Sequence, residues 1–164
     1  MQRQNRQQRN RLNAAWTVIP GELAHSRAGV LRGADFVIVV GGIRVSCDGI
    51  FTTLKALTRG GRIWTSPSPV EFAGPDGDGG DVAVWVECNG GTVLSQIQSG
   101  SVTDGEGEIP TLSSFEVWFP FDVGTVDQAV VVNIQWLARS TGTLRLELEV
   151  AALRDAAARA VELN

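Results

Sequence analysis

The sequence predicts an all-β fold, an antiparallel β-sandwich of jelly-roll type or, alternatively, a closed barrel. Apolar-rich segments of strand length recur along the chain, and Gly-Gly, Asp-Gly and Asn-Gly-Gly turn signals separate them at close intervals. These segments do not alternate with long helical patterns, as they would in an α/β fold. With 164 residues, 43% of them hydrophobic, the chain is long enough for one domain with a sizeable core.

An arm with its own charge precedes this domain. Residues 1–13 read MQRQNRQQRNRLN, without an acid and without apolar periodicity. The arm has four positive charges, on Arg3, Arg6, Arg9 and Arg11. The remaining residues, 14–164, hold ten Lys or Arg and 18 Asp or Glu, so the body has a net charge of −8. The opposite charges predict that the arm binds an acidic surface.

Three interpretations of the arm follow from its composition. It is a frayed, solvated terminus, or an arm held on a neighbouring copy or partner by bidentate Arg–carboxylate contacts, or a contact to nucleic-acid phosphates. The acidic body opposes the third interpretation, so nucleic acid is not an expected partner. An apolar cluster of Trp16, Val18 and Ile19, ended by Pro20 and Gly21, is expected to anchor the arm.

Turn signals divide the first half of the domain into strands. Residues 35–40 and 43–47 are separated by Gly41-Gly42 alone, and this pair supplies the positive φ angles of a tight hairpin. Asp48-Gly49 gives a second hairpin signal that leads into residues 50–57. These signals predict a three-stranded meander.

The next segment predicts a change of direction. A third turn is expected at 59–62, before a strand at 63–66. Residues 66–72 contain Pro67 and Pro69, which donate no ladder hydrogen bonds, so an edge segment or a crossover is expected there.

The second half opens with the strongest hairpin signal of the chain. Asn89-Gly90-Gly91 joins two expected strands, at 81–88 and 92–97. Residues 99–110 are polar and Gly-rich, and this composition predicts a loop. A strand interrupted by Pro120 is expected after the loop.

The last two strands are expected at 129–138 and 143–150. The first is apolar on both faces, as in a central strand, and the second alternates, as in a strand with one wet face. An Ala-rich tail with apolar residues at helical spacing then predicts a short C-terminal helix. The predicted organisation is an arm (1–13), a single β-sandwich domain (14–150) and a tail (151–164).

Residues that transfer protons are scarce, which argues against catalysis. The chain has one His (His25), one Lys and no Tyr, and it lacks a G-x-S-x-G nucleophile elbow. We therefore expect a protein that is not an enzyme. Cys47 and Cys88 lie in predicted strands at a spacing that is not typical of metal ligands. Two free, buried thiols are expected, with a single disulfide as the alternative.

The best candidate for a metal site is the sequence PDGDGGD. Its carboxylates, on Asp76, Asp78 and Asp81, offer hard oxygen ligands to calcium. Counted from Asp76, however, Gly80 and Asp81 occupy positions that an EF-hand reserves for a ligand and a glycine. A plain acidic loop is therefore preferred, and calcium is the alternative. No Gly-rich loop leads into a helix with a Lys, so no cofactor is expected.

Aromatic residues gather at one place in the sequence. Trp118, Phe119 and Phe121 lie within four residues, and successive side chains of a strand point to opposite faces. Some of this aromatic surface is expected to meet a partner subunit or a ligand. Tryptophans at strand positions are expected to fill the core, with a sugar-binding platform as the alternative: Trp64, Trp85, Trp118 and Trp136.

No apolar run approaches the roughly 18 residues of a membrane span, and the N-terminus lacks the charged-then-apolar pattern of a secretion signal. A membrane is therefore not an expected partner, and export by a signal peptide is not expected.

With its β domain, polar arm, acidic loops and little catalytic equipment, the chain resembles structural proteins of tailed-bacteriophage virions, such as head decoration or tail components. The resemblance covers the arm and the sandwich-like body. It implies a homo-oligomer that contacts other virion proteins and is assembled into particles in the host cytoplasm. The arm arginines, Trp16 and the aromatic segment 118–121 would then lie at interfaces. The alternative is a carbohydrate-binding, lectin-like jelly-roll module, calcium-assisted, in host recognition.

Overall fold

The structure of the chain is a computed structural model, and it describes residues 18–23, 28–60, 63, 71–77, 81–139 and 142–162. The described part is mostly β-strand in antiparallel ladders and has one α-helix, which confirms the all-β prediction. The largest sheet has six strands. Five of them follow the spatial order β2 (Gly21–Glu22), β4 (Phe36–Ser46), β5 (Gly49–Thr58), β9 (Thr111–Pro120) and β8 (Gln96–Thr103). The sixth, β3 (Gly29–Arg32), also pairs with β4. The second has four, in the order β11 (Thr143–Leu148), β10 (Val130–Gln135), β6 (Ala83–Cys88) and β7 (Gly91–Leu94). The remaining elements are β1 (Val18–Ile19), β12 (Val161–Glu162), the 3-10 helix η1 (Val123–Thr125) and α2 (Val150–Ala158).

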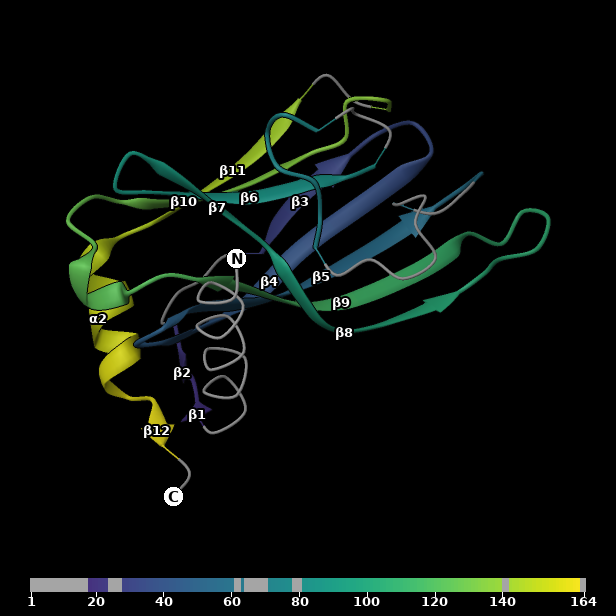
Figure 1. Ribbon diagram of the computed structural model, residues 1–164. Coiled ribbons are helices and arrows are strands. Elements are labelled where there is room, and N and C mark those ends of the chain that lie inside the picture. Colours follow the sequence, from purple (N-terminus) through teal and green to yellow (C-terminus); the bar gives the residue numbers. More distant parts are fainter. Residues whose placement is uncertain are drawn as a thin grey trace, which may run out of the picture.

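The two larger sheets form two layers with the hydrophobic core between them (Figure 1). Buried side chains from the six-stranded sheet, such as Ile38 and Leu54, belong to the same cluster as Val86 and Val132 of the four-stranded sheet. One sheet ends at β8 and the other at β7 and β11, so the described strands form no closed barrel.

The predicted hairpin at Gly41-Gly42 is wrong. β4 is one continuous strand, and both of its halves pair with β5. Gly41 lies opposite Thr53 and Arg44 lies opposite Phe51, so β4 has one residue more than its partner between these pairs. This extra residue is a β-bulge, and Gly42 adopts a φ of 61°, the left-handed conformation for which bulges use glycine.

Two other predicted hairpins are confirmed. β4 and β5 are joined by a two-residue turn, Cys47–Asp48, so the second signal turns the chain where it was expected. β6 and β7 are joined by Asn89 and Gly90, whose φ angles of 48° and 73° are both positive, as in a type I′ turn.

The prediction of a loop over 99–110 is wrong for its first residues. β8 continues to Thr103, which pairs with Leu112 of β9, and only the residues between these two strands form the turn. The strand predicted at 92–97 is divided at Ser95, because β7 belongs to the four-stranded sheet and β8 to the six-stranded one. Ser95 is fully buried at this corner, where its Oγ accepts a hydrogen bond of 2.9 Å from the backbone N–H of Phe72.

The end of the chain follows the sequence prediction more closely. β10 lies between β6 and β11 as a central strand, and β11 buries Leu148 while Thr143, Arg145 and Glu147 are exposed. α2 forms and buries Leu153 and Ala156. The expected strand at 63–66 and the crossover at 66–72 lie mostly outside the described residues.

Candidate assembly surface

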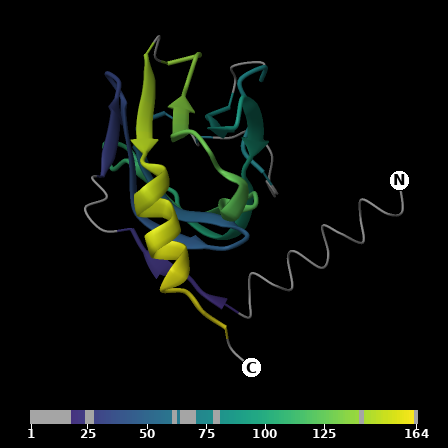
Figure 2. The same ribbon diagram turned by 90° about the vertical axis from the view of Figure 1, so that its left-hand side faces the viewer.

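The start and the end of the described chain meet in a small sheet at one end of the molecule. Val18 of β1 pairs with Glu162 of β12, and Ile19 pairs with Val161. Ile19 and Val161 are 54% and 55% exposed, so this pair places an apolar surface beside the point where the chain enters the described fold. Figure 2 shows α2 in yellow above β12, with β1 close to it. We call this region the base.

Helix α2 fixes the base to the six-stranded sheet and to the segment after η1. A Cβ on Gly21 of β2 would lie 2.0 Å from the carbonyl oxygen of Ala156, so only glycine allows this approach of β2 to the helix. Arg159, just after the helix, donates a hydrogen bond of 2.8 Å to the carbonyl of Glu22 and forms an ion pair with Asp155. Arg154 donates one of 2.7 Å to the carbonyl of Val126, which follows η1.

The predicted contact residues of the arm lie outside the described residues: Arg3, Arg6, Arg9, Arg11 and Trp16. Their charge is a property of the sequence, and the described chain begins after them, at Val18 in the base.

The aromatic segment of β9 is mostly buried within the chain. Phe119 is fully buried in the core between the layers. Trp118, the preceding residue, is fully buried on the other side of the strand, where its ring stacks on Phe51 of β5 with 5.9 Å between the centroids. Phe121, half-buried against the core, is the member of the segment with exposed surface.

The described tryptophans offer little ring surface to a sugar. Trp85, Trp118 and Trp136 are at most 6% exposed. A sugar-binding platform needs an exposed ring face, so these three residues do not form one. Trp64 lies outside the described residues.

The outer face of the six-stranded sheet has an apolar row that sequence reasoning missed. Val37, Leu57 and Leu112 lie side by side on β4, β5 and β9. Leu57 and Leu112 are each 45% exposed, which is high for leucine. Alternation along a single strand predicts that such residues share a face, but only the register between strands brings them together.

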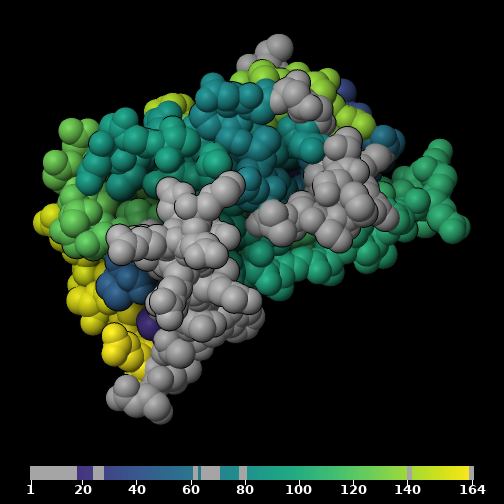
Figure 3. Space-filling model, viewed as in Figure 1, coloured from purple at the N-terminus to yellow at the C-terminus, as the bar shows by residue number. Residues whose placement is uncertain are grey.

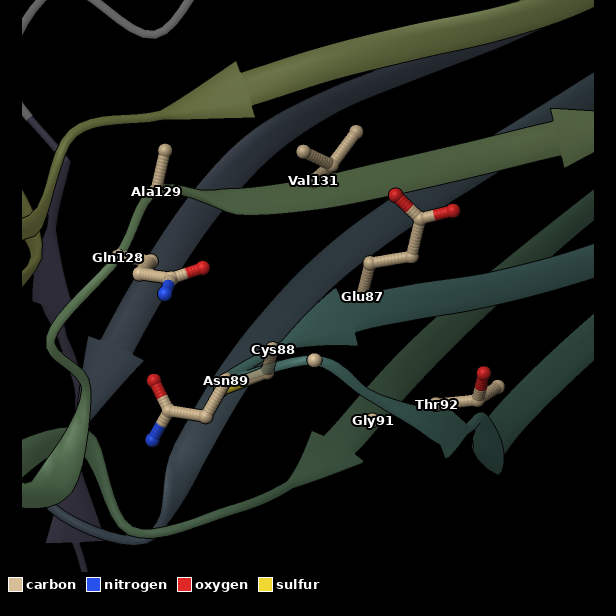
Figure 4. A pocket seen from close by; sticks show the side chains of 9 residues that line it. Glu87, Cys88, Asn89, Gly91, Thr92, Gln128, Ala129 and Val131 are labelled. Atoms are coloured by element: carbon tan, nitrogen blue, oxygen red, sulfur yellow. The ribbon is translucent and has the colours of Figure 1, made fainter.

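A shallow pocket of about 400 Å³ lies at the β6–β7 hairpin (Figure 4). Glu87 and Thr92 line it from the hairpin, Gln128 from the segment that leads into β10, and Val131 from β10 itself. The Glu87 carboxylate accepts a hydrogen bond of 3.0 Å from Arg145 of β11, so its charge is already matched. The pocket offers amide and hydroxyl groups for hydrogen bonding.

The Asn89 side chain holds the hairpin to the neighbouring turn. Its amide nitrogen donates a hydrogen bond of 2.9 Å to the carbonyl of Thr125, and its oxygen accepts one of 3.1 Å from the backbone N–H of Asp127. Asn89 therefore forms the turn and also links the hairpin to the end of η1 and the residues after it.

The structure describes only part of the predicted acidic loop. Asp76 is exposed and Asp81 half-buried, while Asp78 lies outside the described residues. Within the described ranges, no three His, Cys, Asp or Glu side chains are grouped so as to hold a metal ion. His25 is also outside these ranges.

The prediction that both cysteines are buried is wrong. Cys47 is exposed in the β4–β5 turn and Cys88 is half-buried at the end of β6, and both thiols are free. Partial burial raises the pKa of the Cys47 thiol above its ordinary value, and the carboxylate of Asp48 raises it further. Burial likewise raises the pKa of the Cys88 thiol, with a contribution from Asp127.

Replacing Asp48 with asparagine is expected to make Cys47 react faster with iodoacetamide at pH 8. Removal of the negative charge lowers the pKa of the thiol, so a larger fraction of Cys47 is the reactive thiolate at pH 8. The pH–rate profile of Cys47 should move to lower pH, followed by mass spectrometry of the modified peptides. Asp127→Asn is the matched control, since it should affect Cys88 and leave Cys47 unchanged. Equal Cys47 rates in the wild type and in Asp48→Asn would contradict the assigned cause.

Comparison of the chain with protein-family models, with curated proteins and with solved structures found no match. No helix in the described part of the chain is both long enough and apolar enough to cross a membrane.

Proposed function

We propose that this chain is a non-enzymatic structural or assembly protein of a virus particle, a capsid decoration or tail component of a tailed bacteriophage, and that its Arg-rich arm binds neighbouring subunits. The observation that carries the proposal is the division of charge between a +4 arm and a −8 body. An arm without acids and a body with an excess of acids attract each other when they belong to different copies.

The base, where the described chain begins, is held in place by hydrogen bonds and close packing. α2 is fixed to β2 and to Val126 after η1, and β12 pairs with β1, so the described chain begins in a packed region. The exposed pair of Ile19 and Val161 adds apolar contact area to the base. Each exposed Arg–carboxylate contact contributes about 0.2–1 kcal/mol, so binding depends on several of them at once.

As the finer description of the fold, we propose a β-sandwich with jelly-roll-like features. Its support is the hydrophobic cluster of described residues to which both layers contribute. The chain passes between the layers after β5, β7 and β9, while each hairpin stays within one sheet. Each layer is therefore built from segments far apart in the sequence.

Deleting residues 2–13 is expected to weaken association between copies at least tenfold. Native mass spectrometry and sedimentation velocity over a range of protein concentrations would measure the assembly. Replacing Arg3, Arg6, Arg9 and Arg11 together with glutamine should have nearly the same effect, and added salt should weaken the wild type but not these variants. Replacing all four with lysine keeps the charge but removes the bidentate fork, so an intermediate effect is expected.

Two outcomes would overturn the proposed role of the arm. One is a wild-type protein that stays monomeric at high concentration. The other is an assembly whose mass and salt dependence are unchanged by the deletion.

A further inference from the structure

The edges of the two layers differ in how well they are protected. β3 and β11 lie against each other, since a Cβ on Gly29 would be 2.8 Å from side-chain carbons of Leu144 and Leu146. β7 is an edge of four residues. β8 has eight residues, and among the described strands only β9 pairs with it. β8 is therefore the longest open edge in the part of the chain that the structure describes.

β8 lacks the charged residues and prolines that usually protect an edge strand. Its sequence, QIQSGSVT, has no charged residue and no proline, whereas β3 carries Arg32 and β11 carries Arg145 and Glu147. This neutrality matters because the body is strongly acidic, so a second copy is repelled by most of the surface. The edge of β8 is a place where two copies meet without opposing charges.

One half of β8 is regular enough to accept another strand. A bulge lies between Ile97 and Ser99, and from Ser99 to Thr103 the register with β9 is continuous. Ser99, Gly100, Ser101 and Thr103 are exposed. Gly100 must be glycine, because a Cβ there would lie 2.4 Å from the ring of Phe115. The middle of this half of β8 therefore has no side chain. Figure 3 shows the β8–β9 hairpin in green, projecting at the right of the molecule.

We propose that β8 pairs with β8 of a second copy, antiparallel and centred on Ser101, so that two six-stranded sheets become continuous. This register places the two Ser101 residues opposite each other, Ser99 opposite Thr103, and Gly100 opposite Val102. Hydroxyl-bearing cross-strand pairs of this kind stabilise a sheet, and no like charges face each other. The contact uses no residue of the arm and goes beyond the proposed function.

The acidic turn after β8 selects the antiparallel orientation. Asp104, Glu106 and Glu108 follow the strand directly. A parallel pair would bring the two turns together, whereas the antiparallel pair places them at opposite ends of the joined strands. A second copy therefore fits this edge in one orientation.

Ser101→Lys is expected to raise the dissociation constant of the dimer at least tenfold, because it places two positive charges opposite each other across the two-fold axis. Thr143→Lys is the matched control, since Thr143 is an exposed hydroxyl residue on the edge strand β11. Sedimentation velocity over a concentration series gives the dissociation constants. Circular dichroism and thermal unfolding check that both variants fold as the wild type does.

A second variant tests the register directly. In a background with Cys47→Ser and Cys88→Ser, Ser101→Cys is expected to form a disulfide-linked dimer under mild oxidation, whereas Thr143→Cys is not. The arm-deletion variant should keep this cross-link, which separates a failure of the arm proposal from a failure of the β8 contact.

Three results would overturn the β8 contact. The wild type is monomeric at high concentration, or Ser101→Lys associates as strongly as the wild type, or Ser101→Cys fails to cross-link. If the arm deletion abolishes the dimer while Ser101→Lys leaves it intact, the arm and not β8 joins the copies.

Discussion

Replacing Gly49 with alanine is expected to reduce the free energy of unfolding by about 3 kcal/mol or more. Gly49 has a φ of 145°, a conformation that side-chain-bearing residues rarely adopt. A Cβ there would lie 2.1 Å from the backbone carbonyl oxygen of Phe119 and 2.8 Å from Nε1 of Trp118. Backbone cannot step aside as a flexible side chain can, so β5 and β9 would have to separate at this end. Urea unfolding followed by tryptophan fluorescence measures the loss.

Gly90→Ala is the matched control for this prediction. Gly90 also lies in a hairpin turn and has a positive φ of 73°, but no atom lies within 4 Å of the position that its Cβ would take. Only the conformational cost of about 1–2 kcal/mol is therefore expected. Equal losses in the two variants would mean that φ alone, and not the close approach of β9, makes glycine necessary at position 49.

The two layers follow from local patterns, but the partners of the strands do not. The Gly41-Gly42 pair has the chemistry of a hairpin, and sequence reasoning placed a turn there. The chain also contains a signal for the bulge: buried positions change from even numbers, Ile38 and Val40, to odd numbers, Ile43 and Val45. One extra residue in a continuous strand shifts the buried positions from even to odd numbers, whereas a hairpin does not require such a shift.

The error at β8 has a different physical cause. An interior strand is apolar because both of its faces are covered, but an edge strand that projects from the body needs little apolar surface. β8 has half-buried and exposed residues throughout and draws its stability from the ladder with β9. Composition alone therefore marks such a segment as a loop.

The charge of the candidate assembly surface could be predicted, but its location could not. The arm is visible in the sequence because charge is additive along a chain. The base requires the pairing of β1 with β12, two segments more than 140 residues apart, and no local pattern encodes that contact. The apolar row on β4, β5 and β9 was missed for the same reason.

Arg139 links the two layers at the end opposite the base, and its replacement by alanine is expected to cost about 2–3 kcal/mol of stability. Its guanidinium forms an ion pair with Asp35, which lies between β3 and β4. It also donates hydrogen bonds of 2.9 Å to the carbonyls of Arg59 and Gly60 after β5, and its Cζ lies 4.8 Å from the ring centroid of Trp136. One side chain from the β10–β11 turn therefore holds two turns of the other sheet.

The comparison with Arg145 decides whether this linkage or charge alone stabilises the fold. Arg145 forms an ion pair with Glu87 at 3.0 Å, but its side chain is 56% exposed, against 24% for Arg139. Arg145→Ala should cost no more than about 1 kcal/mol, because solvent screens an exposed pair. Arg139→Lys keeps the charge but reaches fewer of the four partners, so its loss should lie between those of Arg139→Ala and the wild type. Equal losses for Arg139→Ala and Arg145→Ala in urea unfolding would mean that the layers are held by the core alone, without help from the turn.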